Sequence, residues 1–474
     1  MSTTPNGQRE ATLFGHPRGL TYLFTTEMWE RFSYYGMRAI LVLYLVNYLL
    51  LPGHVEQVFG YHAIKGLFES FAGPLDVQPF SSLIYGTYTA LVYFTPLIGG
   101  YLADQVFGQR KTVIFGALVM AVGEFVLMLP SMLFVGLLLL IIGNGAFKPN
   151  ISTQVGNLYK PGDSRIDRAY SIFYVGINVG ATLSPFVCGT LGEEYGWNWG
   201  FFAAGVGMLI GLFTYLFAMR TLPADNLTKS KAAPGGKAKF TGEDWKAVIA
   251  LLAICIPAIF FWATYEQQGN TINLWAQDFM DRRLIPGVVD WEIPITWFQA
   301  FNPIMIVLFT PFIVALWGRQ ANKGTELSTP MKMSIGCLLV GVSYLILAGV
   351  AYLNHVDAGG HAYWIWTAFY FVVLTLGELY LSPVGLSLFA RVAPMQIVSL
   401  MMGFWLTTSF LGNFLQGYLG SFWSSMPKVH FWLMIAALAA GAGVAVGLMT
   451  VVLRPVFDRR LKRDRPLVPE PSPG

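Results

Sequence analysis

Long apolar segments alternate with short polar segments along almost the whole chain. A helix that crosses a bilayer needs about 20 mostly apolar residues, and these segments have that length. We therefore predict an all-α membrane protein with twelve transmembrane helices. The predicted spans are residues 19–50, 80–103, 112–130, 132–155, 169–191, 198–219, 247–268, 294–317, 333–353, 361–390, 395–423 and 430–453.

The composition agrees with this prediction. Of the 474 residues, 55% are hydrophobic, 15% aromatic and only 12% charged, which is too apolar for an ordinary soluble domain. Because Cys188, Cys255 and Cys337 lie far apart in apolar segments without metal-ligand spacing, we expect packing roles, no disulfide framework and no metal site. No short apolar region with a cleavage site precedes the first span, which is expected to serve as its own insertion signal.

The loops differ sharply in their content of Lys and Arg. Of the 30 basic residues, 23 fall on one side of the membrane, four on the other side and three within spans. Basic loops stay in the cytoplasm, so we expect a multi-pass protein with both termini there. This bias accounts for the net charge of +4 and gives no reason to expect nucleic acid as a partner. Residues 55–79 form a weakly amphipathic loop on the opposite side, to which we assign no function.

A polar segment, RTLPADNLTKSKAAPGGKAKFTGEDWK, separates the first six spans from the last six. Its content of Pro, Gly, Ala and Lys is typical of a solvated linker. Six plus six spans, with GGYLADQVFGQRK after the second, resemble the major facilitator superfamily, in which two halves rock about a site in mid-membrane. The resulting division is a cytoplasmic segment 1–18, an N-terminal six-helix bundle 19–219, a linker 220–246, a C-terminal six-helix bundle 247–453 and a cytoplasmic tail 454–474.

The first span carries an unusual stripe of charged and aromatic residues in the sequence EMWERFSYYGMR. An Arg at the centre of a membrane helix costs about 2.5–3.5 kcal/mol on insertion scales, so the stripe is expected to face the bundle interior or a water-filled cavity. Pairing of Glu27 with Arg31, four residues apart, offsets part of this cost. The alternative is a structural ion-pair stripe that only fixes the rotation of the helix. The helical face comprises Glu27, Glu30, Arg31, Tyr34, Tyr35 and Arg38.

Three more charged residues lie within other spans. Lys148 precedes a helix-disrupting Pro149, Glu266 follows a long apolar run, and Glu378 lies shortly before a predicted kink at Pro383. For each residue, a structural ion pair is the alternative to a functional role. The bases within spans all belong to the first half, whereas the isolated acids belong to the second. A cavity that is basic on one wall and acidic on the other suits a zwitterion.

The acids of these spans outnumber the bases by four to three. One carboxyl group therefore lacks a basic partner in an empty cavity, and such a group tends to hold a proton that it can release when its surroundings change. This suggests coupling to a proton gradient, with protons as the coupling ion and no other cofactor. Glu124 is left out because the sequence does not indicate which way it faces. The acids are Glu27, Glu30, Glu266 and Glu378, and the bases are Arg31, Arg38 and Lys148.

The stripe in the first span resembles the E-x-x-E-R-F-x-Y-Y signature of the proton-dependent oligopeptide transporter (POT/PTR) family of the major facilitator superfamily. GNGAFKPN, FYVGINVGATLSP, FWATYEQQG, WFQAFNP and GELYLSPVGLS resemble further motifs of this family, in order along nearly the whole chain. The resemblance implies a bacterial inner-membrane protein, expected to be monomeric, that carries di- and tripeptides into the cell by proton-coupled symport and alternating access. No enzymatic activity is expected.

The resemblance also implies roles for individual residues. Lys148 and Glu378 match a pair that can form a cytoplasmic gate, and Glu378 matches the acid that receives the peptide amine. The residues that match the proton-coupling group are Glu27, Glu30, Arg31 and Glu266. Those that match substrate-binding positions are Arg31, Tyr34, Tyr35, Arg38, Tyr93, Lys148, Asn178, Asn302 and Glu378.

Other interpretations of these residues are open. The two asparagines can instead join helices by hydrogen bonds, and the tyrosines can belong to an interfacial belt or to packing. Trp262, Tyr380 and Trp405 could line the pocket, but we favour packing for them.

The chain departs from the family in two ways. Animal members have a histidine where Gly86 stands, so proton coupling is expected to rely on carboxylates. Many bacterial members insert two extra helices between the halves, but the linker is too short for a membrane hairpin. Another small anion or peptide-like solute is an alternative cargo, since plant relatives carry nitrate. A membrane-embedded enzyme is disfavoured because H-E-x-x-H, G-x-S-x-G and clustered metal ligands are missing from the sequence.

Overall fold

The computed structural model describes residues 12–13, 15–160, 163–223, 225 and 240–463. The predicted N-terminal segment, linker and tail therefore lie partly outside the described residues. Within them, twelve α-helices have 19 residues or more, and each corresponds to one predicted span.

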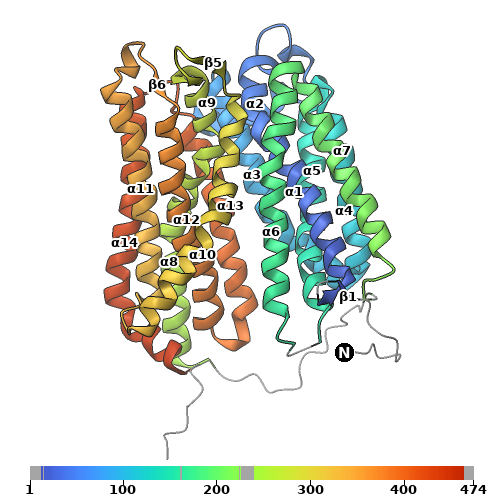
Figure 1. The fold of residues 1–474 in the computed structure, drawn as a ribbon, viewed down its shortest axis with the longest axis vertical. Helices are drawn as coiled ribbons and strands as arrows, with labels where there is room; N and C mark the ends of the chain where they lie inside the picture. Colours follow the sequence, from blue (N-terminus) through green and yellow to red (C-terminus); the bar gives the residue numbers. More distant parts are fainter. Residues whose placement is uncertain (1–11, 14, 161–162, 224, 226–239, 464–474) are drawn as a thin grey trace, which may run out of the picture.

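The twelve long helices form two groups of six that stand side by side (Figure 1). The first half contains α1 (Arg18–Tyr44), α3 (Val77–Leu102), α4 (Gln109–Leu127), α5 (Leu133–Asn157), α6 (Ile166–Ser184) and α7 (Trp197–Ala218). The second half contains α8 (Gly242–Tyr265), α10 (Phe301–Asn322), α11 (Thr329–Leu353), α12 (Ile365–Val392), α13 (Val398–Gly420) and α14 (Lys428–Arg463).

Shorter elements connect or extend these helices. Two short helices are α2 (Tyr61–Ala72) and α9 (Thr271–Asp278). Antiparallel pairs join β1 (Thr12–Leu13) to β2 (His16–Pro17) and β4 (Arg283–Ile285) to β5 (Val289–Glu292), and a parallel pair joins β3 (Met280–Asp281) to β6 (Ala362–Tyr363). The π-helical turns are Leu45–Leu49, Ala103–Phe107, Pro185–Gly189 and Leu191–Tyr195. The 3₁₀ turns are Val55–Gln57, Pro130–Met132, Glu266–Gly269, Ile295–Ala300, Val356–Ala358 and Met395–Ile397.

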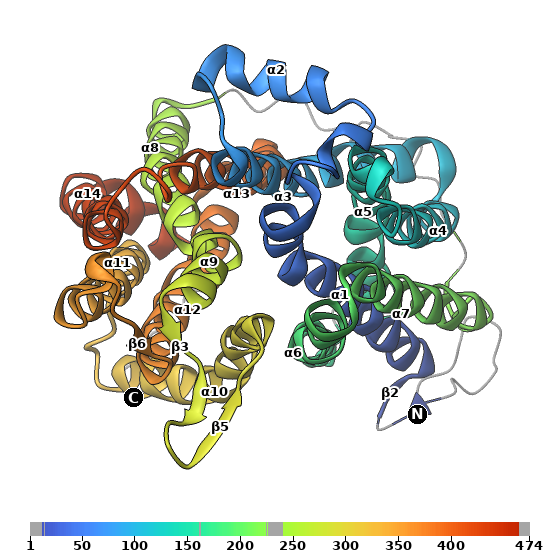
Figure 2. The same ribbon diagram turned by 90° about the horizontal axis from the view of Figure 1, so that it is seen from above.

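The two ends of the molecule are distinguished by these short elements. We call the end where α1 begins and α14 ends the terminal end, and the end with α2 and the β4–β5 pair the hairpin end (Figure 1). α2 lies flat across the hairpin end, whereas the long helices are seen end-on (Figure 2). Its Phe68 packs edge-on against Phe80 of α3, while Leu67 and Phe71 are exposed. The weakly amphipathic loop 55–79 therefore contains an amphipathic helix.

Eight of the described helical segments are long and apolar enough to cross a membrane by length and composition alone. The other four long helices, α1, α3, α4 and α13, contain more polar residues and belong to the same two groups. α1 shows why polar residues are tolerated in such a helix. Of its 27 residues, 19 are buried against other helices rather than facing lipid.

Two predicted local features differ from the structure. The seventh span does not end at residue 268, because the chain continues through the 3₁₀ turn Glu266–Gly269 into α9. Pro149, predicted to disrupt its helix, lies inside α5, which continues past it. Pro383 lies inside α12, and the kink expected there stays a prediction. A proline removes one backbone donor, and neighbouring helices in a membrane bundle can compensate for this loss.

Every hydrogen bond between the two halves that the described residues make lies toward the hairpin end. The first-half side chains that bond across are Arg38, Asn47, Gln78, Ser82, Thr190 and Glu193. Toward the terminal end, no hydrogen bond or ion pair joins two described side chains across the halves, and the ring centres of Phe94 and Phe410 lie 5.2 Å apart there. Among the described residues, the polar contacts that join the halves therefore lie toward the hairpin end.

Two glycines allow a close approach of α3 and α13 at the hairpin end. A Cβ atom at Gly86 would lie 2.5 Å from Cα of Gly417 and 2.8 Å from the carbonyl oxygen of Asn413. Since backbone atoms cannot yield as a flexible side chain can, position 86 has no room for a histidine in this arrangement.

Candidate functional site

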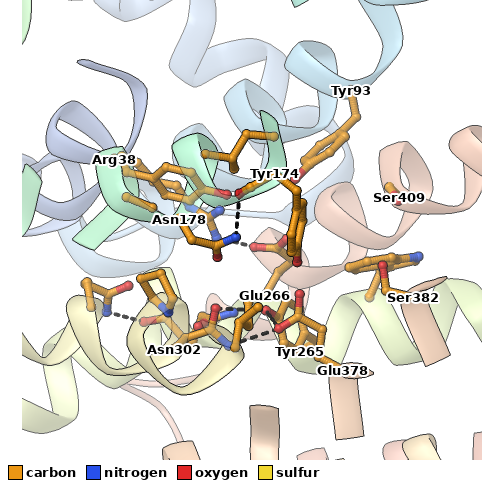
Figure 3. A pocket seen from close by; sticks show the side chains of 18 of the residues that line it. Arg38, Tyr93, Tyr174, Asn178, Tyr265, Glu266, Asn302, Glu378, Ser382 and Ser409 are labelled. Carbon is orange, nitrogen blue, oxygen red and sulfur yellow. Dashed lines mark hydrogen bonds and ion pairs between the residues drawn. The ribbon is translucent and has the colours of Figure 1, made fainter. Parts of the chain in front are cut away.

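A cavity of about 330 Å³ lies between the two halves (Figure 3). This volume is at the lower end of the roughly 300–1,000 Å³ that is usual for small-molecule sites. The polar and aromatic residues that line it are Tyr35, Arg38, Tyr93, Lys148, Tyr174 and Asn178 from the first half, and Trp262, Tyr265, Glu266, Gln268, Gln299, Asn302, Glu378, Ser382, Trp405 and Ser409 from the second.

The charged residues of the lining are divided between the two walls. The first half contributes Arg38 and Lys148, and the second half contributes Glu266 and Glu378. This is the distribution that the sequence predicted. A dipolar ligand that bridges the walls would therefore find opposite charges at its two ends.

Arg38 of α1 connects the walls directly. Its guanidinium group forms an ion pair with Glu266 and donates a hydrogen bond to the hydroxyl of Tyr85 on α3. The side chains of Arg38 and Glu266 are only 8% and 3% exposed. Removal of one partner from such a buried pair costs about 3–5 kcal/mol because the remaining charge is uncompensated. This pair therefore contributes strongly to the closed hairpin end.

The break between α8 and α9 presents Glu266 to Arg38. Glu266 is the first residue of the 3₁₀ turn that interrupts this membrane segment. A Cβ atom at Gly269 would lie 1.9 Å from the hydroxyl of Tyr85 and 3.0 Å from a guanidinium nitrogen of Arg38. Only glycine allows the turn to approach these two side chains so closely.

Lys148 on α5 makes no ion pair within the described residues. Its ammonium nitrogen lies 4.8 Å from the ring centre of Tyr93 on α3, which is a cation–π contact. A cation–π contact supplies less electrostatic stabilisation than a carboxylate does at this depth. Lys148 is therefore available to an anionic group that enters the cavity.

Glu378 on α12 is held by neutral hydrogen-bond donors. One carboxylate oxygen accepts hydrogen bonds from the hydroxyl of Tyr265 at 2.6 Å and from the amide of Asn302 at 3.0 Å. Asn302 also donates to Thr375 at 3.1 Å. These contacts fix the orientation of the carboxylate at the cavity wall without neutralising its charge (Figure 3).

The predicted Lys148–Glu378 ion pair is not formed in this structure. Both residues line the same cavity, yet within the described residues no ion pair joins them. The reason is visible in their surroundings, because Lys148 rests on Tyr93 while Glu378 is bound by Tyr265 and Asn302. The role of this pair as a gate stays a prediction.

The family model of the POT family matches residues 110–234 and 224–434 of the chain. The chain belongs to the POT family. The di-/tripeptide transporter of Lactococcus lactis subsp. cremoris is 30% identical to it, across 94% of this chain and 96% of that protein. The peptide transporter YePEPT of Yersinia enterocolitica is 30% identical, across 96% of both chains.

Solved structures of POT transporters have the same fold. The crystal structure of a peptide transporter POT in complex with sulfate is 31% identical, has a TM-score of 0.79 and covers 96% of this chain and 97% of that one. A complex of a POT variant with alafosfalin has a TM-score of 0.80 at 30% identity, and covers 96% and 97%. These comparisons confirm the predicted family, the fold of two six-helix bundles and the prediction that the chain is not an enzyme.

The cavity contains most of the residues that the POT resemblance selected. Seven of the nine predicted substrate-binding residues line it, whereas Arg31 and Tyr34 do not. Tyr34 is 3% exposed and packs on Tyr35, with the guanidinium of Arg31 over its ring at 5.1 Å. The seven are Tyr35, Arg38, Tyr93, Lys148, Asn178, Asn302 and Glu378.

The predicted proton-coupling residues of the POT signature form a separate cluster behind the cavity wall. Arg31 forms ion pairs with Glu30 and, at 3.3 Å, with Glu27, and all three side chains are almost fully buried. Glu30 also accepts a hydrogen bond from Asn144 on α5 at 3.2 Å. The single stripe predicted for α1 is therefore split, because Arg38 reaches the second half while Glu30 points into its own half. Glu266 alone of the four lines the cavity.

Sequence reasoning missed several residues of the cavity. Trp262 and Trp405 line it, which was the less favoured of the two interpretations of these residues. Tyr380 lies outside the lining and packs edge-on against Trp317, as expected. The other polar residues that were missed are Tyr174, Tyr265, Gln268, Gln299, Ser382 and Ser409. Five of these six lie inside the quoted family motifs, which was the signal available.

No metal site accompanies the cavity in the part of the chain that the structure describes. Groups of three or more His, Cys, Asp or Glu side chains that could hold a metal ion do not occur among those residues. Within the cavity, the chemistry that remains is recognition of charge and hydrogen bonding.

Proposed function

We propose that the chain is a proton-coupled symporter that carries di- and tripeptides into the cell by alternating access. The observation that supports this most directly is that Lys148 and Glu378 lie on opposite cavity walls and neither forms an ion pair within the described residues. Every small peptide carries a carboxylate and an amine at its ends, whereas its side chains vary. A site that reads the two ends accepts many sequences.

The peptide carboxylate binds Lys148, and the peptide amine binds Glu378. Asn178 and Asn302 supply amide groups for the peptide backbone, since both line the same cavity as these charges. Tyr93, Trp262 and other aromatic residues provide walls that tolerate different side chains. The names of the Lactococcus and Yersinia relatives, a di-/tripeptide transporter and a peptide transporter, support this substrate class.

The terminal end is cytoplasmic, because the basic loops lie on that side and such loops remain inside. The chain is a monomer in the plasma membrane of a bacterium, in contact with lipid around both halves. Polar contacts fasten the hairpin end, and none joins the described residues of the two halves toward the terminal end, so the structure fits the state in which the cavity serves the cytoplasm.

Protons are the coupling ion. Protonation of Glu266 removes the negative charge that Arg38 needs, so the hairpin end can part and admit a peptide from outside. In the cluster behind the wall, Glu27 and Glu30 share Arg31. A proton on either carboxyl would loosen this cluster and free the guanidinium of Arg31 to move toward the cavity.

Uptake of dialanine by the purified protein in liposomes tests the proposal, with the pH gradient and the membrane potential set independently. Accumulation above the external concentration is expected only when the outside is more acidic or the inside is negative. The Lys148→Ala variant in the same liposomes is the control for leakage. Accumulation that is indifferent to both gradients would rule out proton coupling, and failure of dialanine to bind would rule out the substrate.

A shorter zwitterion is a second candidate cargo. A POT transporter crystallised with 5-aminolevulinic acid is 28% identical to this chain and has a TM-score of 0.79. This compound has an amine and a carboxylate but no peptide bond. Competition by 5-aminolevulinic acid against labelled dialanine distinguishes a site that reads only the two charges from one that also needs the peptide amide.

A further inference from the structure

Glu124 is a fully buried acid on α4, outside the cavity. One of its carboxylate oxygens lies 3.2 Å from the hydroxyl of Ser33 on α1, which is its hydrogen-bond donor. The other oxygen has no hydrogen-bond partner among the described residues. With Glu124 included, the acids within the predicted spans outnumber the bases by five to three.

The surroundings of Glu124 contain no compensating charge. The titratable groups that face it are Glu30 on α1, Tyr88 on α3 and Cys188 in the π-helical turn after α6. α7 presents Gly205 toward it. No Lys, Arg or His of the described residues pairs with it.

An isolated carboxylate in such a place is far less stable than a neutral carboxylic acid, because burial penalises the charge and no base offsets it. Glu124 is therefore held with a proton in this conformation. Glutamine would make the same hydrogen bond to Ser33 with no titratable group, so packing alone does not require an acid here.

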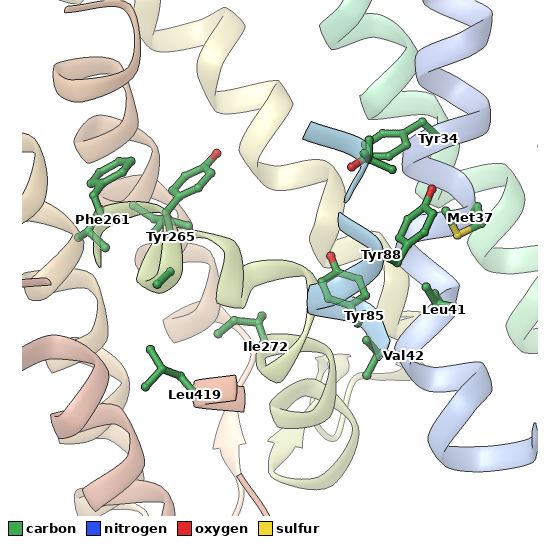
Figure 4. Close-up of a cluster of buried hydrophobic side chains, with 14 of the residues drawn as sticks. Tyr34, Met37, Leu41, Val42, Tyr85, Tyr88, Phe261, Tyr265, Ile272 and Leu419 are labelled. Carbon is green, nitrogen blue, oxygen red and sulfur yellow. The ribbon is translucent and has the colours of Figure 1, made fainter. Parts of the chain in front are cut away.

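A series of buried polar groups leads from Glu124 toward the proton-coupling cluster. Ser33, which contacts Glu124, lies three residues from Glu30, and the two side chains are neighbours on α1. Tyr34 and Tyr88 lie close together between α1 and α3 (Figure 4). Asn144 links α5 to Glu30 at 3.2 Å.

Several atoms of this series have no hydrogen-bond partner among the described residues. They are Oγ1 of Thr26, Oε2 of Glu27, the hydroxyl of Tyr34, Oε2 of Glu124 and Oδ1 of Asn144. Buried polar atoms in proteins are almost always satisfied, and where protein groups do not reach them, ordered water does. These atoms concentrate around α1, so buried polar groups that can bind a proton or an ordered water lie between Glu124 and Glu30.

We propose that Glu124 is a proton-binding site that loads Glu30 through this polar series. α4 ends at Leu127 on the hairpin side, so Glu124 lies within one helical turn of that end, whereas Glu30 lies near the middle of α1. The proton leaves the carboxylic acid of Glu124, passes along water and binds the carboxylate of Glu30. A second proton from the hairpin side then restores the acid at Glu124, so no bare charge remains there.

This inference rests on the proposed proton coupling, and the experiment separates the two. Glu124→Gln keeps the shape of the side chain and the contact with Ser33, and removes only the titratable group. Glu69→Gln on α2 is the matched control, because Glu69 is a partly exposed acid at the hairpin end, paired with Lys65 at 3.6 Å. Both variants and the parent are reconstituted in liposomes.

Three quantities are measured on each protein. The first is exchange of labelled for unlabelled dialanine at equal pH, which requires a folded protein and a working cavity. The second is accumulation driven by a pH gradient. The third is the infrared band of a protonated carboxylic acid, which reports the proton on Glu124 without any transport.

The expected result is that Glu124→Gln retains exchange, loses accumulation above the external concentration and loses one protonated-acid band, while Glu69→Gln matches the parent in all three. Accumulation equal to that of the parent would overturn the inference, and so would an infrared spectrum from which no protonated-acid band is lost. If Glu124→Gln loses exchange as well as accumulation, Glu124→Asp is measured next, because aspartate keeps an acid at this position. If Glu124→Asp also loses both exchange and accumulation, Glu124 is a packing residue and the inference fails.

Failure of the proposed function has a different signature. A parent protein that shows no gradient-driven accumulation contradicts proton coupling, whatever the Glu124 variants do. A parent that accumulates dialanine normally, with Glu124→Gln unchanged, contradicts only the role of Glu124.

Discussion

Lys148 and Glu378 stand on opposite walls of one cavity and are not paired with each other. The ammonium group lies over the ring of Tyr93, and the carboxylate accepts hydrogen bonds from Tyr265 and Asn302. Each contact orients the charged group and leaves its charge uncompensated. The empty site is therefore prepared for a ligand that carries both charges.

Lys148→Gln should weaken dialanine binding by about 1.5–3 kcal/mol, roughly 10- to 150-fold, because a hydrogen bond to a charged group is lost. Calorimetry on the purified protein measures this change. Dialaninamide, the dipeptide amide without a terminal carboxylate, should bind the parent and the variant equally well. If the variant still prefers dialanine over the amide as strongly as the parent does, another basic residue binds the peptide carboxylate.

Glu378→Gln should remove the preference for a free peptide amine. The neutral amide keeps the contacts with Tyr265 and Asn302, so the wall should remain in place while the charge is lost. We expect N-acetyl-dialanine to bind the parent poorly and to lose little further affinity in the variant. Calorimetry with both ligands gives the difference, and a variant that still discriminates between them contradicts the assignment.

Gly86→Ala should abolish transport. Its added Cβ atom would lie 2.5 Å from Cα of Gly417, so α3 and α13 would be forced apart at the hairpin end. Gly441→Ala on α14 is the control, because a Cβ atom there meets no atom within 4 Å. Each replacement of glycine by alanine increases helix propensity by about 1 kcal/mol, so a difference in uptake between the two variants must come from packing. Equal uptake by the two variants would show that the close approach is dispensable.

The location of the cavity could be predicted from a few charged residues. Arg38, Glu266 and Glu378 interrupt apolar spans, and the large free energy of placing a charge in lipid requires them to face inward. The basic residues within spans all belong to the first half and the isolated acids to the second, which predicted opposite charges on the two cavity walls. These arguments need only composition and position, both of which a sequence contains.

The partners of these charges could not be predicted in the same way. Arg31 and Arg38 lie on one predicted face of α1, yet Arg31 remains with Glu27 and Glu30 while Arg38 crosses to Glu266. The difference depends on how α1 is rotated against its neighbours and on the helix break at Glu266, which are properties of tertiary packing. No spacing along one helix encodes them.

The sequence also could not predict whether the Lys148–Glu378 gate is formed. An alternating-access protein has at least two arrangements of the same residues, and one sequence specifies them all. Whether Lys148 meets Glu378 depends on which arrangement is present. Similarly, Trp405 could be placed against the cavity only once the contact of α13 with α12 was known.

Glu30→Gln should spare exchange of dialanine across a membrane and impair accumulation driven by a pH gradient. The amide can still accept from Arg31 and contact Asn144, so the cluster should hold together, but it can no longer take up a proton. Liposome assays at equal pH and under an imposed gradient measure the two activities. Equal loss of both would mean that Glu30 is only structural.

Glu193 should hold the hairpin end closed. Its carboxylate accepts hydrogen bonds from the backbone nitrogens of Ile295 and Thr296, both at 2.8 Å, and from the hydroxyl of Thr296 at 2.6 Å. These donors lie at the start of the 3₁₀ turn that leads into α10, where backbone N–H groups lack partners and a negative charge is favoured. A carboxylate of the first half thus caps a helix of the second.

Glu193→Ala removes three hydrogen bonds that join the halves, and should shift the equilibrium toward an open hairpin end by about 1.5–3 kcal/mol. Spin labels at Tyr195 and Leu353, two exposed residues at the hairpin end of the first and second halves, would report the opening as a longer distance. Glu194→Ala is the control, since its exposed neighbouring side chain makes no hydrogen bond or ion pair within the described residues. A distance distribution unchanged by Glu193→Ala would mean that Arg38 and Glu266, together with the contact of Gly86 with Gly417, suffice to keep this end closed.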